Sequence, residues 1–211
     1  MTGDLWHRLA AEAEQLDAQA GRELRRALAR HAAPLRVQVA GRAGIGREAV
    51  EDGVRRALSR DKALSPDDSA GHLVLGVPVD TPDGPEPVLD ADVVVYVVPR
   101  RLDPSVAHPA DRAVLTAVDR RRVVLVVAGE ADPAECAAVA LGMGAAQERA
   151  VAAGDEHAVA DAVAVCAATA RELRDEQLTR TAAGVAAVPR VRELVEHVLD
   201  LVGSTDAAGA R

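Results

Sequence analysis

Two segments rich in β-branched residues, Asp92–Val98 and Val123–Ala128, constrain the fold more than any other feature of this sequence. Valine dominates both runs, which suits strands that are buried on both faces of a sheet. Shorter segments that suit strands lie at 35–40, 72–77 and, more weakly, 148–152. Helical segments lie between them at 48–59, 109–120 and 133–141. This alternation predicts an α/β fold, with a mainly parallel sheet and helices on both faces.

Amphipathic helical segments flank the predicted sheet at both ends. From residue 4 to about residue 32, leucine and alanine recur at spacings of three and four, which predicts one long helix. Helical patterning resumes after Gly154 and ends in an amphipathic segment that begins near residue 190. We therefore divide the chain into an N-terminal helix (1–33), an α/β domain (34–180), a C-terminal helical segment (181–203) and a flexible tail (204–211).

The composition argues against several classes of function. The chain has no Phe, one Trp and one Tyr, so its core must consist of Ala, Val and Leu and offers little for stacking bases. A net charge of −8 argues against a nucleic-acid partner. Neither cysteine belongs to a CxxC motif and no two histidines pair at helical spacing, so no metal ligand is predicted. Without a signal-peptide pattern or a run that could span a bilayer, we expect a cytoplasmic protein with no transmembrane segment.

A glycine-rich turn follows the first predicted strand, at the start of a helix. Gly41, Gly44 and Gly46 allow the backbone to turn its amides toward an anion, and the helix N-terminus adds about half a positive charge. Against the pattern GxxxxGK(S/T), the spacing from Gly41 to Gly46 is correct, but Arg47 stands at the lysine position and Glu48 at the hydroxyl position. The spacing predicts a phosphate-binding loop, and the two substitutions weaken its chemistry.

The stretch 34–50 resembles the opening of P-loop GTPases, particularly the dynamin-like and Era-like kinds. Asp80–Gly84, followed by 90–98, is similar to the switch II motif DxxG and the strand after it. Val123–Asp132 is similar to the base-recognition strand that ends in (N/T)KxD. The resemblance covers about 34–175 and implies GTP or GDP with Mg²⁺ as the cofactor. The residues that it implies as nucleotide contacts are Gly41, Gly44, Gly46, Arg47, Glu48, Asp80 and Asp132.

The same resemblance implies a protein partner. In dynamin-like proteins, helices before and after the GTPase domain form a bundle that passes the nucleotide state to partners. Because this chain has helical segments at both ends, we expect a protein partner or self-association through the flanking helices.

Departures from the GTPase motifs weigh against turnover. The switch II glycine is displaced by one residue, and Gly129 and Glu130 replace the first two residues of (N/T)KxD, so that only Asp132 is left to contact a guanine. Glu48 is interpreted as an internal anion at the helix N-terminus. We therefore expect a degenerate GTPase-like domain, a pseudo-GTPase, that acts as a regulatory or scaffolding protein-interaction module with little or no nucleotide hydrolysis.

Other interpretations of the loop stay open. One is a divergent GTP-binding P-loop NTPase with weak hydrolysis, in which Arg47 is the phosphate cation and Glu48 or Asp80 holds the metal. Another is a non-catalytic dinucleotide site, because short-chain dehydrogenases carry a similar glycine turn; their Tyr-x-x-x-Lys pair is missing here. The last is a tight turn that binds nothing, in a plain α/β module whose flanking helices are the functional surface.

Overall fold

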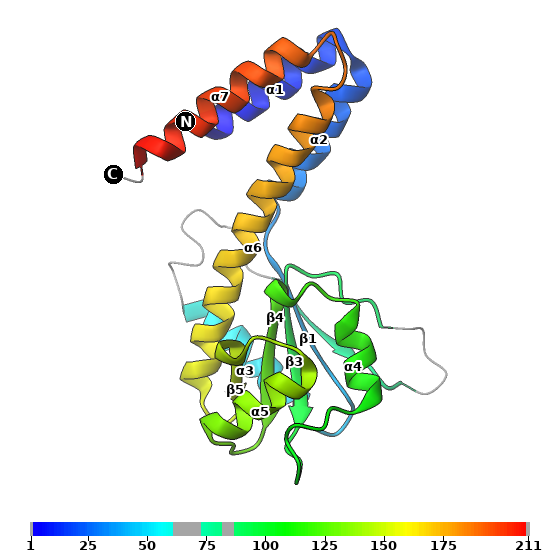
Figure 1. Ribbon diagram of the computed structural model, residues 1–211, viewed down its shortest axis with the longest axis vertical. Helices are drawn as coiled ribbons and strands as arrows, with labels where there is room; N and C mark the ends of the chain where they lie inside the picture. The colour runs from blue at the N-terminus through cyan, green and yellow to red at the C-terminus, as the bar shows by residue number, and fades with distance from the viewer. Residues whose placement is uncertain (1, 61–72, 82–86, 210–211) are drawn as a thin grey trace. The chain divides into compact units, whose positions relative to one another are not determined.

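The structure, a computed structural model, describes residues 2–60, 73–81 and 87–209 (Figure 1). Contacts within the chain divide it into two compact units, a sheet unit (Pro34–Ala170) and a helical unit (Met1–Ala33 with Arg171–Arg211). Helix α6 (Glu156–Val185) begins in the sheet unit and ends in the helical unit. Within the described ranges, no helix combines the length and the apolar character that crossing a membrane requires.

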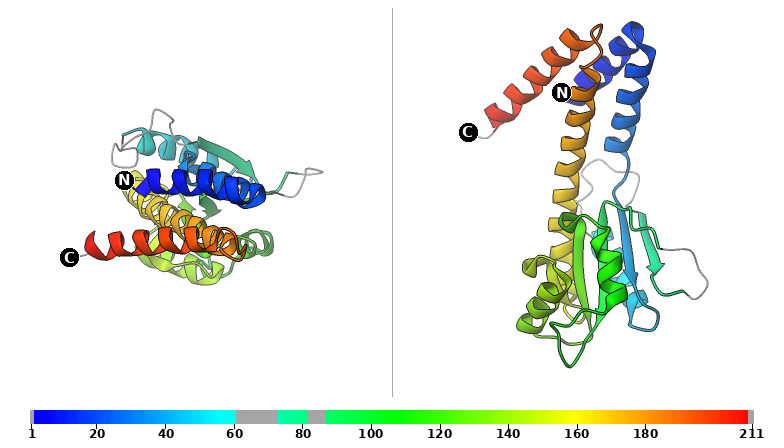
Figure 2. Two further views of the ribbon diagram at one scale, coloured as in Figure 1. Left: turned by 90° about the horizontal axis from the view of Figure 1, so that it is seen from above. Right: turned by 45° about the vertical axis from the view of Figure 1, so that its right-hand side comes forward.

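Five parallel strands form the sheet, in the order β2-β1-β3-β4-β5, so that β2 lies at one edge (Figure 2). The strands are β1 (Arg36–Gly41), β2 (Leu73–Pro78), β3 (Val93–Pro99), β4 (Val123–Ala128) and β5 (Ala150–Ala152). Val37 of β1 lies opposite Val74 on one side and Val93 on the other. The predicted α/β fold with a mainly parallel sheet is confirmed.

Helices cover both faces of this sheet. On one face, α3 (Arg47–Arg60) and the first part of α6 bury a core of small apolar side chains, among them Val54 and Val163. On the other face, α4 (Pro109–Thr116) and α5 (Pro133–Met143) pack over β3 and β4 and bury Leu125. Because valine and alanine supply most of the core, the helices can lie close to the sheet.

The connection from β2 to β3 contains no helix in its described residues, 79–81 and 87–92. Gln38, buried on β1, donates a hydrogen bond to the carbonyl oxygen of Val88 (3.0 Å) and accepts one from the N–H of Ala91 (3.0 Å). The guanidinium of Arg36 binds the carboxylate of Asp90. Hydrogen bonds to β1, rather than a packed helix, therefore hold the described end of this connection.

The helical unit consists of α1 (Thr2–Leu16), α2 (Ala18–Ala32), the end of α6 and α7 (Arg192–Gly209). The prediction of one helix from residue 4 to 32 is wrong, because Asp17 interrupts it and its carboxylate caps α2 by accepting the N–H groups of Gln19 and Ala20. A Cβ on Gly21 would lie 2.5 Å from the Cα of Glu14, so glycine is needed where α1 and α2 approach. Helix α7 continues past residue 204, where we predicted a flexible tail.

The amphipathic helices of this unit bury their apolar stripes against one another. Trp6 and Leu9 of α1, Leu24 of α2, Leu178 of α6 and Val195 of α7 belong to one buried cluster. The apolar faces that the sequence shows at both ends of the chain therefore have their packing partners within the unit.

Candidate functional site

The glycine-rich loop lies between the end of β1 and the start of α3. Gly41 ends the strand, and a Cβ at this position would lie 2.8 Å from the carbonyl oxygen of Val97 on β3. Gly44 and Gly46 have positive φ angles of 73° and 86°, and a Cβ on either one would meet no atom within 4 Å. Close packing therefore requires the first glycine, whereas the backbone conformation requires the other two.

A carboxylate of the chain itself occupies one amide of this loop. Asp80, which follows β2, accepts a hydrogen bond from the backbone N–H of Ala43 at 2.8 Å. In a phosphate-binding loop, such amides point at the ligand. The structure thus brings Asp80 to the loop, where its carboxylate is a partner of the backbone. Gly84, at the other end of the predicted switch II motif, lies outside the described residues.

Arg47 and Glu48 begin α3 and neutralise each other. Nη2 of Arg47 donates to Oε1 of Glu48 at 2.6 Å. This hydrogen bond, followed by one from the backbone N–H of Glu48 itself, lowers the pKa of the Glu48 carboxyl. The Arg47 side chain is only 14% exposed, and its Nε and Nη1 are buried without a hydrogen-bond partner in the described part of the chain. Most of the cation therefore lies inside the protein, beside its own counterion.

A buried polar network, which the sequence analysis missed, fixes the other side of the loop. Asp111, in the first turn of α4, is 2% exposed and accepts a hydrogen bond from the Tyr96 hydroxyl at 3.0 Å. Nε of Arg42, the first residue after Gly41, lies 3.3 Å from the same carboxylate, and Nη2 of Arg101 lies 4.0 Å from it. Burial and the negative charge of Asp111 raise the pKa of Tyr96.

One sequence signal pointed toward this network. Tyr96 is the only tyrosine of the chain, and it stands in a run of valines that was predicted to be buried. A buried hydroxyl group needs a hydrogen-bond partner, so a polar partner was to be expected. The sequence did not show which residue this partner is. Asp111 follows Pro109 at the start of a helix, where an acidic residue is common.

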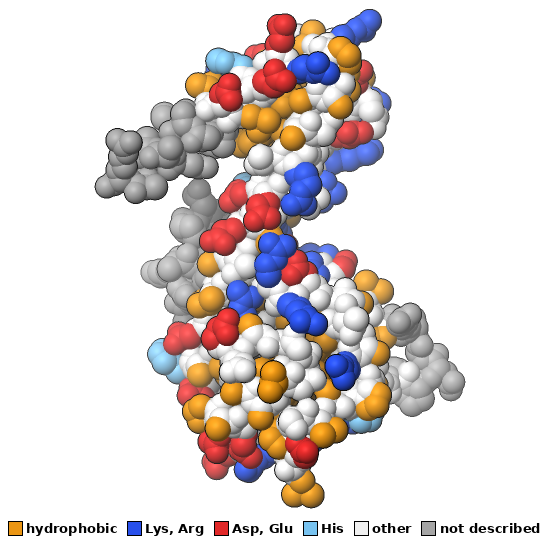
Figure 3. All heavy atoms as spheres, viewed as in Figure 1, with side chains coloured by type: hydrophobic (Ala, Val, Ile, Leu, Met, Phe, Trp, Pro, Cys, Tyr) orange, Lys and Arg blue, Asp and Glu red, His pale blue; other side chains and the backbone are white. Residues whose placement is uncertain are grey.

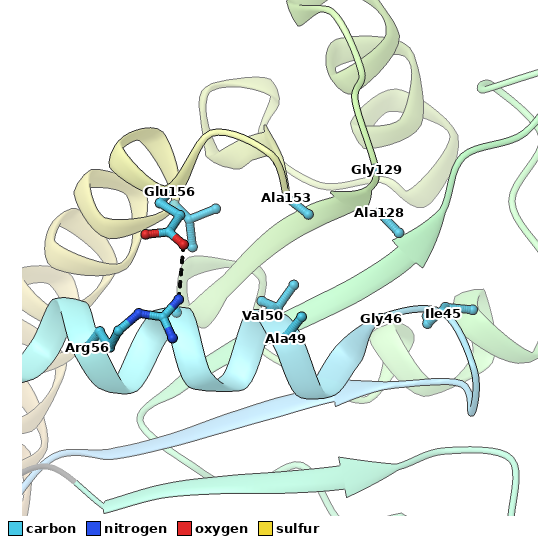
Figure 4. A pocket seen from close by; sticks show the side chains of 11 residues that line it. Ile45, Gly46, Ala49, Val50, Arg56, Ala128, Gly129, Ala153 and Glu156 are labelled. Carbon is cyan, nitrogen blue, oxygen red and sulfur yellow. Dashed lines mark hydrogen bonds and ion pairs between the residues drawn. The ribbon is translucent and has the colours of Figure 1, made fainter.

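A cavity of about 260 Å³ lies beside the loop, between α3, the end of β4 and the start of α6. In Figure 4, Ala49 and Val50 of α3 face Ala128 and Ala153 across the cavity, and Arg56 hydrogen-bonds Glu156 at 3.0 Å. The cavity is lined by Ile45, Gly46, Ala49, Val50, Gly53, Arg56, Ala128, Gly129, Ala153, Glu156 and Val159. Gly46 is the one predicted site residue in this lining.

Asp132, the predicted base contact, caps a helix. Its Oδ1 accepts the N–H of Glu135 at 2.8 Å, and Oε2 of Glu135 accepts the N–H of Asp132 at 3.1 Å, which completes a capping box at the start of α5. Glu135 also accepts hydrogen bonds from Arg100. Asp132 does not line the cavity beside the glycine loop, so the structure does not bring it together with Gly46.

The carboxylates that were predicted to hold Mg²⁺ have partners within the protein. Glu48 and Asp80, the carboxylates predicted to hold the metal, contact Arg47 and the Ala43 amide instead. Across the described ranges, no three His, Cys, Asp or Glu side chains come together in a group that could hold a metal ion. The geometry therefore supports a loop that is held by the protein's own carboxylates.

The chain matches no protein family, no curated protein and no solved structure. The fold and the site define an α/β protein with a parallel sheet and a glycine-rich loop at the carboxyl edge of that sheet. The resemblance to P-loop GTPases stays a prediction from the motifs.

Proposed function

We propose that this chain is a degenerate GTPase-like domain that acts as a regulatory or scaffolding protein-interaction module, with little or no nucleotide hydrolysis. The hydrogen bond from the Ala43 amide to the Asp80 carboxylate carries this proposal. A phosphate would need that amide, and it would have to approach a carboxylate that is already in place.

The ion pair between Arg47 and Glu48 supports the same function. Arg47 stands at the position where a phosphate-binding loop carries its lysine. Because Glu48 binds this cation at 2.6 Å, an incoming phosphate must displace or tolerate a second negative charge. Both electrostatic features that favour an anion at such a loop, the amide and the cation, thus have internal partners.

The helical unit supplies the interaction surface in this proposal, either for a protein partner or for self-association. Its apolar stripes are buried within the unit, so a partner would contact the outer, polar faces of the helices. Four arginines of α2 are exposed, Arg22, Arg25, Arg26 and Arg30, and of these Arg25 forms an ion pair with Glu14. A surface of this kind favours an acidic partner and an association that weakens with salt.

A titration with nucleotides tests the proposal. The wild-type chain is mixed with fluorescent GTP, GDP or ATP in the presence of Mg²⁺, and fluorescence anisotropy is followed into the micromolar range. We expect no saturable binding, and the same flat response from Arg47→Ala. Tight binding that depends on Mg²⁺ and is lost in Arg47→Ala would sink the proposal.

A divergent NTPase with weak hydrolysis is the second candidate. It is favoured by Nε and Nη1 of Arg47, which are buried without a hydrogen-bond partner among the described residues, and by the cavity beside Gly46. In this candidate, Arg47 is the phosphate cation, and Arg47→Ala abolishes a measurable release of phosphate. An unchanged background rate in that variant would dispose of it.

A further inference from the structure

The cavity beside the glycine loop is an unfilled space at one end of the core that α3 and α6 cover. Its volume of about 260 Å³ is close to the lower end of the range for small-molecule sites, about 300 to 1,000 Å³. Ile45, Ala128 and Ala153 pack against the core of this face, yet each of them is only half-buried. The same three residues line the cavity, so a ligand there would cover apolar surface that the fold leaves open.

A glycine inside α3 leaves room in this cavity. Gly53 lies in the interior of the helix, where glycine is less stable than alanine. A Cβ at this position would meet only Nη2 of Arg56 within 4 Å, at an ordinary contact distance of 3.8 Å. Close packing therefore does not require a glycine here. Because Gly53 lines the cavity, its missing side chain adds to the open space.

The walls and the mouth of the cavity differ in their chemistry. The walls consist of alanine, valine, isoleucine and glycine. At the mouth, Arg56 and Glu156 are joined by a hydrogen bond of 3.0 Å, and their side chains are 49% and 66% exposed (Figure 4). Because the two charges cancel, the mouth favours an uncharged ligand. The hydrogen bond uses one of the five N–H donors of the guanidinium, so the pair can still bind one polar group.

The volume of the cavity sets the size of the ligand. An apolar cavity of about 150 Å³ stays dry and binds benzene. In proportion, the volume of 260 Å³ takes about ten non-hydrogen atoms, which is the size of a fused pair of rings. A nucleobase of this size carries polar atoms around its edge, and the apolar side chains of these walls cannot pair with them. The walls therefore favour a ligand with an apolar body.

The rest of the visible surface lacks this concentration of apolar groups. Over the sheet unit in Figure 3, apolar side chains are scattered singly among polar ones, which is ordinary for a protein surface. In the cavity, by contrast, apolar side chains from the glycine loop, α3, β4 and the start of α6 face one space. Convergence of this kind, with a few polar groups at the mouth, is typical of a ligand site.

We propose that this cavity binds a small uncharged ligand of about ten non-hydrogen atoms, with its apolar body inside and one hydrogen-bonding group at the pair of Arg56 and Glu156. The inference goes beyond the proposed function and does not rest on it. Of the predicted nucleotide contacts, only Gly46 lines the cavity.

Calorimetric titration of the full chain with two fused-ring compounds of similar size tests the proposal. Indole is the probe, because it combines an apolar body with a single N–H group that can donate to Glu156. Adenine is the control, because hydrogen-bonding atoms surround its rings. We expect saturable binding of indole in the submillimolar range and binding of adenine that is at least about tenfold weaker.

Protein variants then locate the binding. Gly53→Leu puts a side chain into the space and should weaken indole binding at least about tenfold. Ala49→Leu, at an exposed residue of the lining, should also weaken it, and this variant carries the test if Gly53→Leu does not fold. Gly184→Leu is the matched control, because a Cβ there meets no atom within 4 Å and belongs to the helical unit. It should bind indole like wild type. Circular dichroism establishes that each variant is folded.

Several results would overturn the proposal. These are no binding of indole, binding of adenine as tight as that of indole, or unchanged indole binding in the folded cavity variants. A loss in Gly184→Leu equal to the loss in Gly53→Leu would also overturn it, because binding would then not depend on the cavity. The titration with fluorescent nucleotides tests the proposed function separately, so the two failures are distinguishable.

Discussion

The two loops that follow β1 and β4 lie at the same carboxyl edge of the sheet, but they are held in different ways. The loop after β4 is closed by its own sequence neighbours, since Asp132 and Glu135 cap α5 reciprocally. The loop after β1 is held from a distance, by Asp80 at the Ala43 amide and by Asp111 at Arg42. The loop after β4 is therefore held by residues close to it in the sequence, whereas the loop after β1 is held by carboxylates that are distant in the sequence.

The largest effect on this comparison should come from Asp111→Ala. The change leaves the partly buried Arg42 without its counterion and the Tyr96 hydroxyl without its acceptor. Loss of one partner of a buried pair costs about 3 kcal/mol in the free energy of unfolding. Denaturant titration followed by circular dichroism measures it. Tyr96→Phe should lose only about 1 kcal/mol, and equal losses in the two variants would mean that the ion pair contributes nothing.

A smaller loss is expected from Gly41→Ala, which tests the packing of the loop against β3. The new Cβ would lie 2.8 Å from the carbonyl oxygen of Val97, so the strand must shift, at a cost of about 2 kcal/mol in the free energy of unfolding. Gly53→Ala in α3 is the matched control, because a Cβ there meets nothing nearer than Arg56 at 3.8 Å. The free energy of unfolding of the control should rise by about 0.5 kcal/mol, as measured by thermal unfolding. A stable Gly41→Ala variant would contradict the close packing.

Asp132→Ala tests the local closure after β4. It removes the side-chain cap of α5, and we expect a loss of about 1 kcal/mol in the free energy of unfolding. Asp132→Ser keeps a capping oxygen and should lose much less. If both variants lost the same stability, the role of Asp132 would lie outside the capping box.

The smallest effect should be the pH dependence contributed by Glu48. Its pKa is lowered in the folded protein, first by Arg47. The stabilisation is therefore complete above the unfolded pKa of about 4.3 and is lost as the pH falls through the lower folded value. Glu48→Gln should flatten the stability profile slightly in this acid range, as measured by thermal unfolding between pH 2 and pH 6. If stability depended more steeply on pH in Glu48→Gln than in wild type, the pKa of Glu48 would be raised on folding, which would contradict this account.

Much of the fold was predictable because the strands carry a local signal. The run of valines placed β4 at its observed ends, and β3 begins one residue later than predicted. The break between α1 and α2 was missed because Asp17 stands among residues that favour helices, with neither Gly nor Pro at the break itself. Asp17 can cap α2 because the chain changes direction between α1 and α2. The spacing of apolar residues in the sequence does not show this change of direction.

The candidate site likewise has local features that the sequence predicts and long-range contacts that it does not. The glycine positions and the start of α3 followed from spacing alone. The partners of Ala43 and Arg42 could not be predicted from the sequence. Asp80 and Asp111 reach the loop only because the fold places β2 and α4 near β1. A sequence records which residues can cap or pair, but distant pairs depend on the topology of the sheet.

The most direct test compares wild type with the double variant Glu48→Ser, Asp80→Ala. The double variant removes both carboxylates that neutralise the loop, and its binding of fluorescent GTP is measured by anisotropy beside the wild type. We predict no saturable binding by wild type and saturable binding by the variant, with an affinity at least about tenfold above the detection limit set by wild type, because two negative charges beside the phosphates are removed. Binding by wild type that equals or exceeds that of the variant would contradict the claim that the chain's own carboxylates hold this loop in place of a nucleotide.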